Sequence, residues 1–170
     1  MPNSLVVEID LQDDTKITVI NTYHAVPMRG GHDLHYLFRY KIDKLTPTVL
    51  IGDFNTHTHR WSLLGRAPSS WGAELEEWLN QNGLQVMNPD GVPTWVGLRE
   101  GDRPSIIDLA FANEVVIFTN QISPLEVSLG DSLGSDHTAL LFQIYPLTHI
   151  ALQPPPAPIG YRADPEHCDS

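Results

Sequence analysis

The chain has 170 residues, of which 41% are hydrophobic and 8% aromatic, a composition typical of one globular domain. It has no long apolar segment and no charged-then-apolar amino terminus. The sequence therefore predicts neither a membrane helix nor a secretory signal, and favours an intracellular location, nuclear or cytoplasmic. The single cysteine, Cys168, excludes a disulfide framework. A net charge of −11 is unusual for a protein that binds nucleic acid, because phosphate binding usually draws on clustered Lys and Arg.

In chain order, the apolar pattern first predicts a hairpin of two strands, at about 4–11 and 16–23. A helix is expected over 33–45, ended by Thr46-Pro47 because the residue before proline disfavours the helical region. Its predicted apolar face consists of Leu34, Leu37, Phe38 and Leu45. A strand over 48–53 follows, with a continuous apolar run typical of a strand covered on both faces.

A second helix is expected over 70–82, with Gly83 as its cap. Four apolar residues recur in it at helical spacing: Trp71, Leu75, Trp78 and Leu79. Short strands are predicted at 84–87, 93–96, 105–112, 115–118 and 138–144. The proline-rich segment 146–170 is predicted to be an extended tail or linker, which leaves a domain over 1–145.

The first polar motif is Gly52-Asp53-Phe54-Asn55, at the end of the strand 48–53. If the extended conformation persists, Asp53 and Asn55 point to the same side, where a carboxylate and a carboxamide can hold a water and a phosphate oxygen. The alternative is ordinary turn chemistry, since Asp and Asn hydrogen-bond local backbone and Gly supplies positive φ.

Two more acidic motifs follow, Ile106-Ile107-Asp108 and Ser135-Asp136-His137. Asp108 interrupts a strand that otherwise reads as buried, so it is either a functional carboxylate or a structural acceptor for backbone amides. His137 adds a side chain that titrates near neutrality. The three motifs together indicate a catalytic site.

The order of these motifs resembles the endonuclease/exonuclease/phosphatase superfamily, and most closely the endonuclease domain of non-LTR (LINE-type) retrotransposons. Asn21-Thr22-Tyr23 resembles the family strand that ends in Asn-x-Tyr, and Pro93-Thr94-Trp95 resembles its Thr-containing segment. The resemblance covers about Leu5 to Ile144. It implies an α/β fold, a four-layer α/β/β/α sandwich of the deoxyribonuclease and abasic-endonuclease type, here N-terminally truncated.

The resemblance also implies residue roles. Asp53 would orient or deprotonate the attacking water, and Asn55 would position the water and the phosphate. His137 would stabilise charge on the phosphoryl oxygens, with Asp108 accepting its other ring proton. Asp136 would be a ligand, direct or through water, of Mg²⁺, with Mn²⁺ as the alternative ion. The remaining members of the implied site contact phosphate or border the DNA groove: Tyr23, Thr94, Ser135 and His57.

The family's strands that carry an Asn and a metal-binding Glu have no match upstream of Tyr23, so the chain resembles the C-terminal two-thirds of the domain. The expected function is metal-dependent phosphodiester hydrolysis in DNA, slow or absent without that segment. The expected partners are DNA, a missing N-terminal segment and a reverse transcriptase region, with no membrane.

Three rival readings remain. The first is a catalytically dead remnant that serves as an interaction module. The second is a phosphoesterase acting on inositol phosphates or phospholipid head groups. The third is zinc binding by His32 and His35 or by His57 and His59, whose spacings suit metal ligation. No cysteine pairs accompany these histidines.

Overall fold

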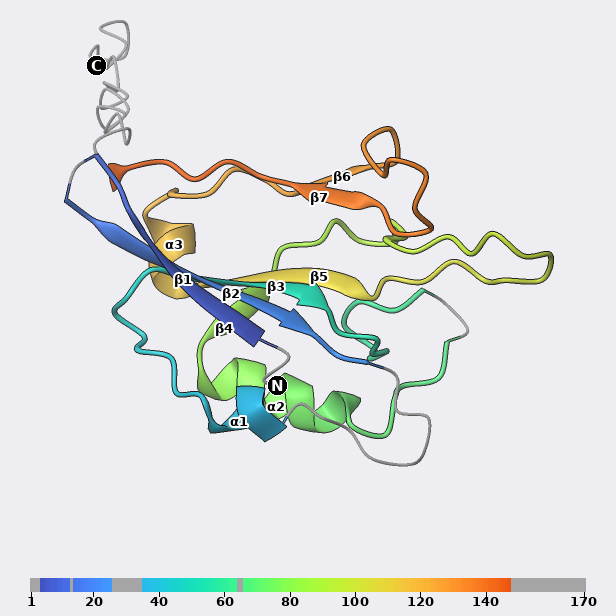
Figure 1. Ribbon diagram of the computed structural model, residues 1–170. Helices are drawn as coiled ribbons and strands as arrows, with labels where there is room; N and C mark the ends of the chain where they lie inside the picture. The colour runs from blue at the N-terminus through green and yellow to red at the C-terminus, as the bar shows by residue number, and fades with distance from the viewer. Residues whose placement is uncertain (1–3, 13, 26–34, 64–65, 148–170) are drawn as a thin grey trace, which may run out of the picture.

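The computed structural model describes residues 4–12, 14–25, 35–63 and 66–147. Five strands form one sheet in the order β1-β2-β3-β5-β4, and β6 pairs antiparallel with β7 in a second sheet. Figure 1 shows α1 and α2 on one side of the larger sheet and β6 and β7 on the other. The strands are β1 Ser4–Asp10, β2 Lys16–Tyr23, β3 Thr48–Asp53, β4 Leu84–Val86, β5 Asp108–Asn113, β6 Glu126–Ser128 and β7 Ala139–Leu141.

The two faces of the larger sheet bury different side chains, because successive residues of a strand point to opposite faces. In β3, Leu50 packs into a core with α2 (Gly72–Gln81) and α1 (His35–Arg39). Val49 packs instead with Val116 of α3 (Glu114–Phe118) and, on the side of the second sheet, with Phe142. The predicted two-sided burial of this strand is therefore confirmed, and so is the α/β fold.

The predicted hairpin is confirmed as β1 and β2, which pair antiparallel from Ser4↔Thr22 to Asp10↔Lys16. Among the described residues β1 is an edge strand of the sheet. It leaves apolar side chains partly exposed, from 61% for Leu5 to 37% for Ile9. Lys16 forms ion pairs with Glu8 and Asp10, which partly balance the acidic side chains of this edge.

The second predicted helix is confirmed as α2, with Trp71, Leu75, Trp78 and Leu79 all buried and Gly83 at a φ of 67°. The first is shorter than predicted. It ends at Arg39 because α2 holds the chain that follows: the Trp78 Nε1–H donates to the Tyr40 carbonyl. Leu45 is 83% exposed rather than on a buried face. Leu34 lies outside the described residues.

The prediction of a strand over 115–118 was wrong, since this segment forms α3. A short apolar run fits either structure, and here the Asn113 side chain caps the helix by accepting from the Val116 amide. Other strands are shorter than expected. Trp95 makes only isolated bridges, the 105–112 strand starts at Asp108, and the last strand spans Ala139–Leu141. Strand β6 was not predicted, and most of the 146–170 tail lies outside the described residues.

Candidate active site

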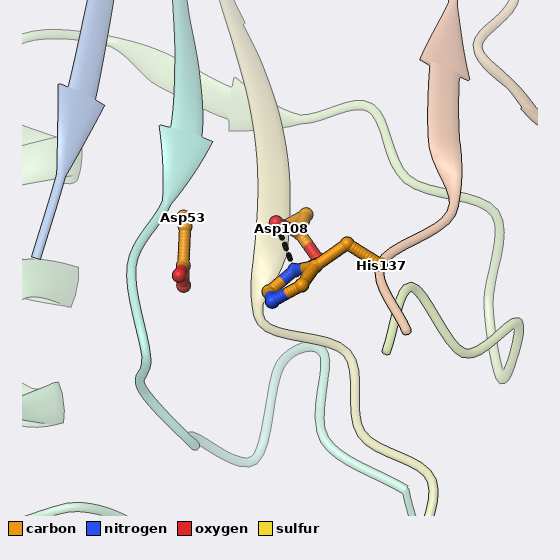
Figure 2. Close-up of side chains that lie close together, drawn as sticks. All are labelled: Asp53, Asp108 and His137. Carbon is orange, nitrogen blue, oxygen red and sulfur yellow. Dashed lines mark hydrogen bonds and ion pairs between the residues drawn. The ribbon is translucent and has the colours of Figure 1, made fainter. Parts of the chain in front are cut away.

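Two of the predicted acidic residues meet because their strands are antiparallel neighbours. Asp53 is the last residue of β3 and Asp108 is the first of β5, and the two are paired opposite each other in the sheet. The end of one strand therefore lies beside the start of the other, although 54 residues separate them in the sequence. Figure 2 shows both carboxylates at this edge, with His137 reaching Asp108 from the segment before β7.

His137 is held by Asp108 as predicted. Its Nδ1 lies 3.0 Å from both carboxylate oxygens of Asp108. In the neutral ring this contact places the proton on Nδ1 and leaves Nε2 for another partner. The Asp108 side chain is 15% exposed and that of His137 is 36% exposed, so the pair is sheltered while the ring stays accessible.

Asp53 and Asn55 do lie together, but the extended conformation does not persist to bring them there. Asn55 has a φ of 45°, so the chain turns directly after the strand. In this turn the Asn55 backbone N–H donates to Asp53 Oδ1 at 3.0 Å, and its Nδ2 donates to Asp53 Oδ2 at 2.9 Å. The same Nδ2 also donates to the carbonyl of His24 at 2.8 Å. The turn thus holds the Asp53 carboxylate in place, so the hydrogen bonds of an ordinary turn and the placement of a site carboxylate are both found at this position.

The close approach of β2 and β3 sets the backbone just before Asp53. Gly52 has a φ of 146°, and a Cβ at this position would stand 1.8 Å from the Thr22 carbonyl oxygen. Only glycine fits such a conformation against a neighbouring strand. Gly52 therefore determines where the strand ends and where Asp53 points.

Thr94 does not occupy the predicted position on the surface of the site. It is fully buried, so its side chain has no surface with which to contact a phosphate. Its hydroxyl oxygen accepts from the amides of Ile107, at 3.0 Å, and of Asp108, at 2.9 Å. Its carbonyl accepts from the amide and the hydroxyl of Thr138. Thr94 thus joins the backbone at Asp108 to the backbone next to His137.

The side chains of Ser135 and Asp136 also form hydrogen bonds with other residues of the chain. The Ser135 hydroxyl accepts from the His137 amide at 3.1 Å, and Asp136 Oδ2 accepts from the Trp95 indole N–H at 2.9 Å. Tyr23 and His57 line the cavity described below. Trp95 belongs to the Pro93-Thr94-Trp95 motif, but nothing in the sequence indicates that it is the partner of Asp136.

The site opens into a cavity of about 970 Å³. Asp53, Asn55 and His137 line it, and so do three residues that the motifs did not identify: Arg66, Arg103 and Ser105. Nothing in the sequence separates these arginines from other surface arginines. They reach the cavity through loops, whose course the strand pattern does not define.

Burial and neighbouring charge shift the pKa values of the site. Burial, and then the negative charge of Asp108, raise the pKa of Asp53 to about 6. Burial also raises the pKa of Asp108, although His137 opposes this. Burial acts to lower the pKa of His137, but its hydrogen bond to Asp108 and the surrounding carboxylates outweigh burial and raise it. Burial and the charge of Arg66 lower the pKa of His57.

The donor set fits a divalent cation. Asp53, Asp108 and His137 form the one group among the described residues whose potential ligand atoms all lie within 4.8 Å of one another. Carboxylate oxygens suit Mg²⁺ and Mn²⁺, and a cation here would offset both causes that raise the pKa of Asp53, which are burial first and the charge of Asp108 second. Asp136 is not in this group, and neither are His57 and His59. His32 lies outside the described residues.

The comparisons with known proteins agree with this geometry. A family model described as endonuclease-reverse transcriptase matches residues 17–141. The chain belongs to the endonuclease–reverse transcriptase family. This confirms the predicted endonuclease/exonuclease/phosphatase superfamily, whose members are hydrolytic nucleases and phosphatases. Among curated proteins, none matches the chain.

Several solved structures share the fold of this chain. The endonuclease domain of TRAS1, a telomere-specific non-LTR retrotransposon, is 25% identical with a TM-score of 0.67, over 84% of this chain and 63% of that domain. An endonuclease/exonuclease/phosphatase from Beutenbergia cavernae is 21% identical (TM-score 0.59, 84% and 39% covered). The Xenopus laevis APE2 catalytic domain is 18% identical (TM-score 0.54, 84% and 55% covered). This member of the endonuclease–reverse transcriptase family thus spans less than two thirds of each. None of its described helices has the length and apolar character to cross a membrane.

Proposed function

We propose that this chain hydrolyses phosphodiester bonds in DNA with the help of Mg²⁺, for which Mn²⁺ can substitute. The observation that carries the proposal is the contact between Asp108 and His137 beside Asp53, at the mouth of a cavity large enough for a nucleotide. The similarity to the TRAS1 endonuclease domain supports DNA as the substrate.

Asp53 is proposed as the base. Without the cation, burial raises the pKa of Asp53 to about 6, so the carboxylate is mostly ionised at neutral pH and can accept a proton from water. Asn55 holds both carboxylate oxygens and so fixes the direction from which the water attacks. The water oxygen bonds to phosphorus and its proton passes to Asp53. The P–O bond opposite the water breaks, and the leaving oxygen takes a proton from solvent.

His137 is proposed to donate from Nε2 to a non-bridging phosphoryl oxygen, where negative charge increases in the transition state. Asp108 supports this role because its contact with Nδ1 fixes the ring and favours the protonated form. Carboxylate oxygens of Asp53 and Asp108 would help to hold the cation, with Asp136 as the further ligand predicted from the motif, whereas His137 donates from both ring nitrogens and would not be a ligand. Such an ion supplies charge stabilisation to the phosphoryl oxygens.

Nicking of supercoiled plasmid DNA in Mg²⁺, in Mn²⁺ and in EDTA tests the proposal. We expect slow metal-dependent nicking, which Asp53→Asn and His137→Ala should each reduce by about a hundredfold or more, as for loss of a general base or a transition-state donor. Matched controls are Asp90→Asn and His59→Ala, which replace exposed residues outside the cavity. A folded wild-type chain that nicks in no metal would favour the inactive interaction module. Activity that survives both site variants would place the chemistry elsewhere.

A further inference from the structure

Two arginines share the cavity with the proposed catalytic residues. Arg66 follows β3 in the chain, and Arg103 lies between β4 and β5. We call Arg66 and Arg103 the arginine pair. The Nη2 group of Arg66 donates to the carbonyl oxygens of Arg103 and Pro104, so the two segments that carry the pair are tied together.

The arginine pair brings two positive charges into a cavity that Asp53 and Asp102 also line. Among the described residues, neither Arg66 nor Arg103 forms an ion pair, although the chain has a net charge of −11 and Asp102 lines the same cavity. Arg66 uses only Nη2 in its contacts with the two carbonyls, and a guanidinium has five N–H donors in all. The charge of Arg66 acts on another residue of the cavity, since after burial it is the second cause that lowers the pKa of His57.

A single phosphodiester does not account for these groups. The proposed mechanism already assigns His137 to the reacting phosphate, and Asp53 and Asn55 to the attacking water. The cavity, at about 970 Å³, is at the upper end of the range for small-molecule pockets. Guanidinium groups match phosphate in geometry as well as in charge, so a second phosphate is the anion that would use the remaining donors.

We infer that the arginine pair binds a phosphate of the DNA strand next to the scissile one, so that Arg66 and Arg103 position the substrate without contacting the reacting phosphate. This inference rests on the proposed function for the position of the reacting phosphate. The second phosphate is covalently linked to the first, so binding it helps to hold the scissile bond against Asp53 and His137.

The first test measures binding without catalysis. Fluorescence anisotropy of a labelled oligonucleotide in EDTA, across a KCl series, gives the slope of log affinity against log salt. Each of Arg66→Ala and Arg103→Ala should reduce the magnitude of this slope by about 1, because each removes one phosphate contact. Arg39→Ala is the matched control, since this exposed arginine ends α1 and does not line the cavity. Unchanged slopes in both cavity variants would overturn the inference.

The second test compares substrates. For each variant, kcat/KM is measured with an oligonucleotide and with bis(p-nitrophenyl) phosphate, a single phosphodiester. The ratio of the two values should fall several-fold in Arg103→Ala, whose exposed side chain makes no contact that the fold requires. A ratio that does not change in an active enzyme overturns the inference and leaves the proposed function intact. Arginine-dependent binding by a chain that hydrolyses neither substrate refutes the proposed function and supports the inference.

Discussion

Replacing Thr94 by valine should destabilise the protein without removing any atom from the cavity surface. The substitution keeps the side-chain shape but leaves the buried amides of Ile107 and Asp108 without their acceptor. Each unsatisfied buried amide costs about 1–3 kcal/mol, so the free energy of unfolding should fall by about 2–6 kcal/mol. Typical domains have about 5–15 kcal/mol in total, so the loss is easily measured.

Urea unfolding followed by tryptophan fluorescence and far-UV circular dichroism checks this value. We expect a lower midpoint at an unchanged slope. Thr94→Ser keeps the hydroxyl and should stay close to wild type. Thr138→Val should cost only about 1 kcal/mol, because the Thr94 carbonyl still accepts from the Thr138 amide. If Thr94→Val unfolds like wild type but no longer nicks DNA, the hydroxyl contacts substrate and the structural role assigned to it is incorrect.

Three other changes have defined outcomes. In EDTA, the stability of Asp53→Asn relative to wild type should be most favourable above pH 6 and decline as the pH falls toward 4. Because the pKa of Asp53 is raised in the folded state, the ionised carboxylate destabilises the wild type, and this penalty disappears as the carboxylate becomes protonated. Urea titrations over this pH range measure the difference in the free energy of unfolding between the two proteins. A difference that stays constant with pH would contradict the reasoning. Gly52→Ala should lower the free energy of unfolding by about 3 kcal/mol or more. Gly91→Ala should lower it by only about 1–2 kcal/mol, because Gly91 has a φ of 71° and open space around its Cβ. Equal melting temperatures of the two variants would contradict this. Asn113→Ala should cost at least about 2 kcal/mol in the same urea assay, because its side chain accepts from the amides of Thr48 and Val116; a loss below about 0.5 kcal/mol would show that water replaces it.

The sequence was most informative where a residue stood out against its neighbours. Asp108 within a buried apolar run and His137 after a serine and an aspartate were identified from residue types and family order, and the structure brings them into contact. Periodicity predicted α2 well, because Trp71, Leu75, Trp78 and Leu79 recur three or four residues apart on one face over about two turns. Such signals are contained within a short stretch of sequence, so they can be found without knowledge of the tertiary contacts.

Other features depend on contacts that no short window contains. The segment 115–118 forms a helix because Asn113 caps it, and α1 ends early because Trp78 holds the following backbone. Thr94 was expected to contact phosphate, but it is buried, because a motif gives the identity of a residue and not its burial. The arginine pair reaches the cavity through loops, so its position follows from tertiary structure alone.

Because Asp53 and Asp108 are paired across two strands, the site depends on the register between β3 and β5. A shift of β5 by one residue would turn its alternating side chains over and move Asp108 to the opposite face of the sheet, even if an apolar core could still form. Single-residue insertions should therefore be tolerated in exposed turns of the loop between β4 and β5 that do not line the cavity, such as the turn at Gly91. Within β3 or β5 the same insertion should abolish the site. Length variation among proteins built on this sheet should accordingly concentrate in the loops.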